Sequence, residues 1–466
     1  MNRTLNPAAA RPSTGSCRLW FESALLPQGW ARNVRVDVSA GKIVSVDIEV
    51  TAAAGDERHR LGVPGMPNVH SHAFQRAMAG LTSARGRSSD SFWTWRELMY
   101  RFVGCLQPDD LEAIAAQAYV EMLEAGFTHV GEFHYLHHAA DGTRYAELAE
   151  NSFRLLSAAQ DTGIGLTILP VFYAHSGFGG AAPQASQQAF ITHLDEYSRL
   201  LHDVSRQAAA VTDTVVGVAP HSLRAVTPQE LQVVWGLLPD TPVHIHVAEQ
   251  TREVEECVAW SGQKPVAWLL DHAPVDSRWC LVHATHMDAQ ETGALARSGS
   301  VVGLCPITEA DLGDGLFPAI TYANAGGMFG IGSDSNVVID VAQELRSLEH
   351  GQRLLHRARN ALARDELSTG RALFEDASRG GAVALDSQAG RLEVGRSGDI
   401  VSLNLNHPAM LARSGDSLLD TWILATREPL VDCVWRAGRP LVRGGHHKAR
   451  LAVRERYERT LNRLLV

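Results

Sequence analysis

Eight short apolar runs, each followed by a segment of helix length, constrain the fold of this chain more than any other feature of its sequence. Several of the runs are apolar on both faces, which is typical of parallel strands covered by helices. Eight such strand and helix pairs between residues 63 and 388 predict an α/β fold, a TIM (β/α)8 barrel with insertions. In order, the runs are MPNVHSH, THVGEFHY, LTILPVFYAH, VVGVAPHS, PVHIHVAE, WCLVHATH, VVGLCPIT and FGIGSDSN.

The two ends of the chain have a different pattern. Residues 17 to about 60 and the stretch after about 389 alternate like short strands joined by turns. We expect these ends to meet in a small β-sandwich beside the barrel. The predicted units are therefore 1–62 for the N-terminal part of the sandwich, 63–388 for the barrel, and 389–466 for the C-terminal part with a terminal helix.

Charge and apolar content exclude several classes of partner. A net charge of -10 and a pI of about 6.1 argue against a surface for nucleic acid or anionic membranes, because such surfaces need a basic field. The chain has no apolar stretch of about 18 residues, and its start lacks the apolar core of a signal peptide. The six cysteines show no paired spacing. We expect a cytoplasmic protein that acts on a small molecule.

Polar side chains end several of the apolar runs, which is where a barrel of this kind carries its chemistry. The first run ends in His70-Ser71-His72, and strand alternation points both imidazoles into the barrel mouth. His246 lies in the fifth run and Asp334 in the eighth. These four side chains predict a site for one divalent metal, Zn²⁺ in the first place, with Fe²⁺ or Mn²⁺ as alternatives.

Three acid–base side chains near the predicted metal suggest a hydrolytic reaction. The ion would activate a water molecule, and Asp334 could take the proton of that water. Glu249 is placed to carry protons to the substrate nitrogen and to a leaving ammonia. His283 could hydrogen-bond the attacking water or the tetrahedral centre that develops.

The sequence also bears on other metal arrangements. His244 alternates with His246 and could compete as a ligand. A binuclear site bridged by a carboxylated lysine is excluded, because the fourth run ends in Pro220-His221-Ser222. Glu132, at the end of the second run, could hold a second ion, although the pattern favours one.

Together these residues resemble the amidohydrolase superfamily in its mononuclear deaminase branch, over almost the whole chain. Within that branch the pattern is most similar to the formimidoylglutamate deiminases, or N-formimino-L-glutamate iminohydrolases. The HxH and SD elements are common to the superfamily, whereas WTWRELMYR and HSLRAVTP are far more specific. The similar stretches are PGMPNVHSHAFQRAMAG (64–80), DSFWTWRELMYR (90–101), EFHYLHH (132–138), HSLRAVTP (221–228), HIHVAEQ (244–250), CLVHATH (280–286), TEADLGDGLFPA (308–319) and GIGSDS (330–335).

The resemblance implies a zinc enzyme of histidine degradation that releases ammonia from N-formimino-L-glutamate and leaves N-formyl-L-glutamate. It assigns Arg96, Tyr135 and Arg224 to the glutamate carboxylates, for which arginine forks are well suited. It places Gln75 and His221 near the formimino group. Together with the general frequency of twofold dimers, it also favours a homodimer.

Two competing interpretations and one atypical position accompany this hypothesis. One competitor is an aminohydrolase for a neutral ring, such as guanine, cytosine, an adenosine derivative or a triazine, which would share the metal ligands. Such a substrate needs aromatic stacking and amide donors rather than paired arginines. A non-catalytic barrel scaffold is disfavoured, because every catalytic position is filled. Asp311 stands where this family is expected to have Asn, and a negative charge in contact with a dicarboxylate would weaken its binding.

Overall fold

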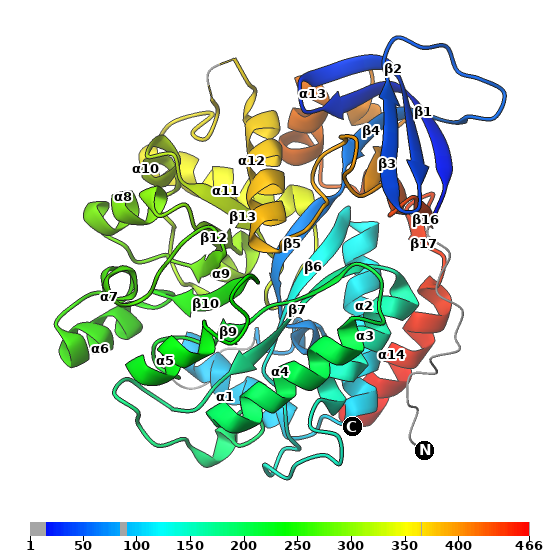
Figure 1. Ribbon diagram of the computed structural model, residues 1–466. Helices are drawn as coiled ribbons and strands as arrows, with labels where there is room; N and C mark the ends of the chain where they lie inside the picture. Colours follow the sequence, from blue (N-terminus) through cyan, green and yellow to red (C-terminus); the bar gives the residue numbers. More distant parts are fainter. Residues whose placement is uncertain (1–14, 84–90, 365, 466) are drawn as a thin grey trace.

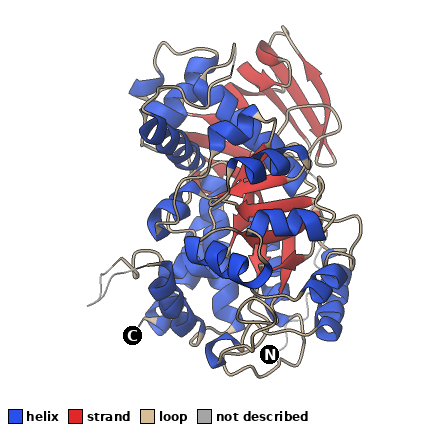
Figure 2. Ribbon diagram, turned by 90° about the vertical axis from the view of Figure 1, so that its left-hand side faces the viewer, coloured by secondary structure: helices blue, strands red, loops and turns tan. Residues whose placement is uncertain are grey.

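The centre of the molecule is a closed barrel of parallel strands wrapped by helices (Figures 1 and 2). The computed structural model describes residues 15–83, 91–364 and 366–465. Strand pairing runs in the order β10-β11-β12-β13-β5-β6-β7-β8, with β9 beside β7, and the bridges Val218–Val243 and Ser222–His246 close the ring. The predicted barrel is confirmed. Its strands are β5 (Met66–Ser71), β6 (Phe127–His134), β7 (Gly165–Phe172), β8 (Thr214–Val216), β9 (Ala219–Pro220), β10 (Val243–Val247), β11 (Trp279–His283), β12 (Val301–Leu304) and β13 (Met328–Ile331).

The surrounding helices begin where the sequence carries start signals. At the start of α8, Asp288 accepts a hydrogen bond from the Glu291 amide at 2.8 Å and its own amide donates to the Glu291 carboxylate at 3.0 Å, which is a capping box. No helix in the described part of the chain is long and apolar enough to cross a membrane. The helices of this region are α1 (Phe92–Val103), α2 (Pro108–Glu124), α3 (Glu150–Thr162), α4 (Leu194–Ala208), α5 (Pro228–Val234), α6 (Thr251–Ser261), α7 (Pro265–His272), α8 (Ala289–Arg297), α9 (Pro306–Leu312), α10 (Ala319–Asn324), α11 (Val341–His356) and α12 (Thr369–Ala384).

Strands from both ends of the chain form a second sheet beside the barrel, as expected (Figure 1). Their order is β17-β16-β15-β14-β4-β1-β2-β3, so N-terminal β4 pairs directly with C-terminal β14. The last helix, α14, packs against α2 of the barrel. The elements are β1 (Cys17–Leu26), β2 (Gly29–Ser39), β3 (Lys42–Asp47), β4 (Glu57–Pro64), β14 (Ile400–Leu403), α13 (Asp416–Asp420), β15 (Val431–Arg436), β16 (Arg439–Arg443), β17 (His446–His447) and α14 (Arg450–Leu464).

The limits predicted for the three units stay predictions. β4 crosses the first predicted limit and leads through Gly65 into β5, the first barrel strand. Residues 1–14 of the predicted N-terminal unit lie outside the described residues.

The end of α12 reaches the barrel interior on the side away from the predicted chemistry. His244 on β10 donates from Nε2 to the Ala384 carbonyl at 2.8 Å, and the Thr167 hydroxyl on β7 donates to the Leu385 carbonyl at 2.8 Å. Carbonyls at a helix C-terminus have no partner within the helix, so these buried side chains satisfy them. The bottom of the barrel is thereby closed.

Replacing Gly380 is expected to damage this packing. A Cβ atom at Gly380 of α12 would lie 1.9 Å from the carbonyl oxygen of Phe329 on β13, and backbone cannot yield as a flexible side chain can. We expect Gly380→Ala to destabilise the fold by about 3 kcal/mol or more. The melting temperature and the urea midpoint measure the loss. Gly55→Ala is the matched control, since nothing lies within 4 Å of its Cβ position, and equal stability of the two variants would contradict the prediction.

Candidate active site

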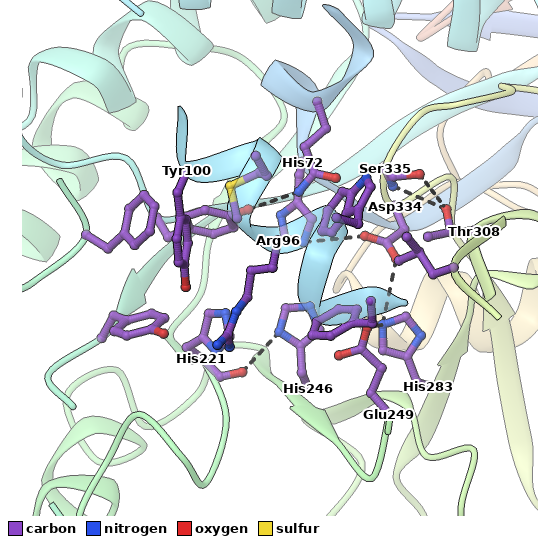
Figure 3. A pocket seen from close by; sticks show the side chains of 18 of the residues that line it. His72, Arg96, Tyr100, His221, His246, Glu249, His283, Thr308, Asp334 and Ser335 are labelled. Carbon is purple, nitrogen blue, oxygen red and sulfur yellow. Dashed lines mark hydrogen bonds and ion pairs between the residues drawn. The ribbon is translucent and has the colours of Figure 1, made fainter. Parts of the chain in front are cut away.

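Three of the predicted metal ligands, His72, His246 and Asp334, lie close together at the C-terminal ends of β5, β10 and β13 (Figure 3). His70 groups with His72 and His246, and Asp334 lies beside it. Backbone hydrogen bonds join β5 to the segment after β13: the Asp334 amide donates to the His70 carbonyl and the His72 amide donates to the Asp334 carbonyl, both at 2.9 Å. This ladder carries Asp334 to the edge of the barrel where the HxH pair projects. His246 reaches the same point from β10.

Four donor atoms converge within a few ångströms. His70 Nε2 lies 3.2 Å from His72 Nε2 and 3.0 Å from His246 Nε2. Asp334 Oδ1 lies 3.6 Å from His70 Nε2 and 3.4 Å from His72 Nε2. All four side chains are buried. Three imidazole nitrogens and a carboxylate oxygen are a donor set that suits Zn²⁺ or a similar divalent cation.

Hydrogen bonds behind two of the rings leave their Nε2 lone pairs free for a cation. His72 Nδ1 donates to the Phe133 carbonyl at 2.9 Å, and His246 Nδ1 donates to the His221 carbonyl at 3.1 Å. Burial lowers the pKa of His72 to about 3 and also lowers the pKa of His70 and His246. Metal-binding imidazoles must be neutral, and outer hydrogen bonds of this kind orient them. The residues therefore fit a metal ion.

The two alternative ligands have other partners. His244 is bonded to the Ala384 carbonyl at the bottom of the barrel. Glu132 accepts a hydrogen bond from the Ala73 amide at 2.7 Å, at the start of the short helix that follows His72. Neither belongs to the cluster of donor atoms among the described residues.

Glu249 and His283 border the cluster on its β10 and β11 side. His283 Nε2 lies 3.8 Å from Glu249 Oε1 and 3.7 Å from Asp334 Oδ2. Burial raises the pKa of Glu249 above its ordinary value and that of Asp334 to about 6. Burial of His283 disfavours its charged form. The neighbouring carboxylates nevertheless raise the pKa of His283 to about 10; they belong to Glu249, Glu309 and Asp334. The three groups can hold and exchange protons beside the metal donors.

The five residues predicted to bind substrate line one pocket with these groups. The pocket encloses a cavity of about 60 Å³ beside the clustered donor atoms. In it, Gln75 Nε2 donates to the Tyr135 hydroxyl at 3.0 Å. Figure 3 shows Arg96 and His221 on the same side of the pocket. The predicted substrate residues in the lining are Gln75, Arg96, Tyr135, His221 and Arg224.

Comparisons with known proteins show the family of this chain. Residues 62–441 match the family model "Amidohydrolase family", and residues 20–60 match "Formimidoylglutamate deiminase HutF, N-terminal domain". A formimidoylglutamate deiminase of Pseudomonas aeruginosa is 51% identical over 92% of this chain and 95% of its own length. The chain belongs to the formimidoylglutamate deiminase branch of the amidohydrolase family.

Further matches include one distant relative in sequence and two solved structures. A 5-methylthioadenosine/S-adenosylhomocysteine deaminase of Haloarcula marismortui is 27% identical over 81% of each chain. Among solved structures, an amidohydrolase from Brucella melitensis superposes with a TM-score of 0.93 at 53% identity, covering 97% of this chain and 100% of that one. An adenosine deaminase from Xanthomonas campestris with bound zinc has a TM-score of 0.79 at 22% identity, covering 97% and 99%, which shows the fold alone.

Two polar residues of this amidohydrolase site were not singled out from the sequence. Glu309, on α9, accepts a hydrogen bond from His283 Nδ1 at 3.2 Å and another from the Cys305 amide at 2.9 Å. It therefore orients the ring whose Nε2 faces Glu249. In the sequence, only its position within TEADLGDG, a stretch similar to the deiminase family, could have indicated a role in the site.

Asn336 is the second of these residues. Its Nδ2 donates to the Ser71 hydroxyl and the His72 carbonyl, both at 3.1 Å, and to the Asp334 carbonyl at 3.0 Å. It is fully buried, with a left-handed φ of 55° that Asn tolerates better than most residues. Asp334 also has a positive φ, of 43°, and such strain is often found at functional sites. Asn336 thus ties the ends of the two ligand-bearing segments together.

The atypical Asp311 lies away from this pocket. It is exposed and is not among the residues that line the pocket, whereas its neighbour Leu312 is. The charge of Asp311 therefore does not form part of the pocket wall.

Proposed function

We propose that this enzyme hydrolyses the formimino group of N-formimino-L-glutamate to N-formyl-L-glutamate and ammonia in histidine degradation. The observation that carries the proposal is that Arg96 and Arg224 line the same pocket as the metal-type donor cluster. The likeness to the Pseudomonas aeruginosa deiminase supports the same reaction. A neutral ring would offer no carboxylate to the half-buried Arg96 and the buried Arg224, which is unfavourable.

The proposed mechanism divides the pocket into a tail end and a reacting end. Arg96, Tyr135 and Arg224 bind the two carboxylates, while Gln75 and His221 face the formimino group. Guanidinium groups can bind carboxylates with two parallel hydrogen bonds, which fixes orientation as well as position. The reacting carbon is thereby held beside Asp334.

At the reacting end, the chain's own carboxylates move the protons. A divalent cation held by His70, His72, His246 and Asp334, proposed to be Zn²⁺, would supply Lewis acidity when bound. Asp334 accepts a proton as water adds to the formimino carbon, and the imidazole of His283 hydrogen-bonds the oxygen that adds. Glu249 delivers protons to the nitrogen, which leaves as ammonia while the carbon keeps the oxygen as a formyl group.

The direct test is ammonia release by the purified, zinc-loaded protein from N-formimino-L-glutamate, compared with guanine, cytosine and adenosine. Turnover of the formimino acid alone supports the proposal. Activity only on a ring substrate would overturn the proposed substrate but would remain consistent with the proposed metal site. Elemental analysis of protein purified without added metal tests the identity of the ion.

Arg224→Ala is expected to raise KM for N-formimino-L-glutamate by about 10- to 100-fold, the equivalent of one lost charged hydrogen bond. The tail contact is made equally in the ground state and the transition state, so kcat should change little. Steady-state kinetics separate the two constants. Arg379→Ala, an exposed arginine outside the pocket, is the control. Unchanged kinetics in Arg224→Ala would remove this residue from the substrate site.

We also propose a cytoplasmic homodimer. The general preference of soluble oligomers for twofold symmetry supports the dimer, and the scattered free cysteines fit a reducing compartment. Light scattering on the purified protein tests the oligomeric state.

A further inference from the structure

One indole ring, that of Trp93 on α1, contacts three guanidinium groups. The Cζ atom of Arg252 lies 4.5 Å from the ring centre, that of Arg96 4.6 Å, and that of Arg224 5.9 Å. The three arginines come from α6, from α1 and from the loop after β9. Three positive charges would repel one another, and the negative face of an indole reduces that cost more than any other side chain's ring does. Trp93 is therefore the common partner that holds these segments together.

The two pocket arginines have few other partners. No carboxylate among the described residues lies within ion-pair distance of Arg96, whose other aromatic neighbour is the Tyr100 ring at 5.7 Å. Arg224 is 6% exposed, and the nearest carboxylate oxygen, on Glu253, is 4.0 Å away at the limit of an ion pair. Its Nε atom is buried and has no hydrogen-bond partner in the described structure. Arg96 thus has no ion-pair partner among the described residues, and Arg224 has only the carboxylate of Glu253 at 4.0 Å.

This mode of support has a chemical consequence. A carboxylate partner would occupy the N–H groups of an arginine and cancel its charge, so it would compete with an acidic substrate. An aromatic face holds a guanidinium through its plane and leaves the in-plane N–H donors free. The indole can therefore position Arg96 and Arg224 while keeping both available for carboxylates.

We propose that Trp93 is a positioning residue that sets the spacing of Arg96 and Arg224 and thereby the affinity of the pocket for a substrate with two carboxylates. Trp93 does not line the pocket itself, so it acts through the arginines. Arg252 anchors the ring from the first turn of α6, where it also pairs with Glu256 at 2.7 Å. The inference rests on the proposed function, because it concerns the tail end of the same substrate.

The test is the steady-state kinetics of Trp93→Leu and Trp93→Phe with N-formimino-L-glutamate. Trp93→Leu removes the aromatic face and is expected to raise KM by about 10- to 30-fold, with kcat within about twofold of the wild type. Trp93→Phe retains a face and should restore most of the affinity. Trp93→Met is a second ringless variant in case the leucine variant does not fold.

A matched control keeps the test specific. Trp260→Leu removes a partly buried tryptophan that stacks on Phe178 outside the pocket, and KM should not change. An unchanged KM in the ringless Trp93 variant would overturn the inference. An equal fall in kcat in Trp93→Leu and Trp93→Phe, with KM unchanged, would also overturn the inference, because it would indicate a structural role for Trp93. A wild-type enzyme that fails to release ammonia from this substrate would instead overturn the proposed function.

Discussion

Asp334→Asn is expected to lower kcat by about four orders of magnitude. The carboxylate lies 3.4 Å and 3.6 Å from two of the clustered imidazole nitrogens. It is also the group that we propose to take the proton of water. Asparagine keeps the shape but removes the charge and the basicity. Both contributions are lost together.

The measurement is ammonia release under metal-saturating conditions, with metal content determined on the same samples. Asp311→Asn makes the same chemical change at an exposed position outside the pocket and should leave kcat and KM unchanged. If Asp334→Asn retained more than a few per cent of wild-type kcat, another group would have to accept the proton.

Glu249→Gln is expected to lower kcat by about 10²- to 10⁴-fold, the range for a lost general acid–base catalyst, with KM changed only slightly. Burial raises the pKa of the Glu249 carboxyl, which makes it a better proton carrier near neutral pH than an exposed glutamate. Glutamine fills the same space but cannot carry a proton. Because Glu249 lies 3.8 Å from His283, the substitution also removes a negative neighbour of that ring.

Ammonia release under saturating substrate isolates the effect on kcat. Glu255→Gln is the control, since Glu255 is an exposed residue of α6, the helix that begins two residues after Glu249. A rise in KM with kcat preserved would assign Glu249 to substrate binding instead of proton transfer.

Metal content distinguishes the role proposed for Asp334, a metal ligand, from that proposed for Glu249, which only transfers protons. We expect metal content to fall in Asp334→Asn, because a ligand is changed, and to stay near wild type in Glu249→Gln, whose carboxylate is not among the clustered donors. Equal metal loss in both variants would mean that the two carboxylates share the ion.

Much of the barrel and its metal-type cluster could be predicted from local pattern. Apolar runs bounded by turns indicate strands, and two-residue alternation places His70 and His72 on one face, because both rules depend only on nearby residues. Barrels carry their chemistry at strand ends, and this rule singled out His246 among the 21 histidines of the chain. The same rule singled out Asp334. The resemblance added Arg96 and Arg224, which periodicity alone would not single out.

The tertiary structure alone decided which side chains support these groups. Glu309 orients His283 from α9, Asn336 joins the ends of β5 and β13, and Trp93 gathers arginines from three segments. Only the contact between Trp93 and Arg96, three residues apart on α1, follows the period of a helix. The others join residues that are brought together only when the barrel closes. Local sequence therefore determined the strands, the fold class and the ligand types, whereas the orientation, burial and pKa of each group depend on long-range packing that no short window of sequence contains.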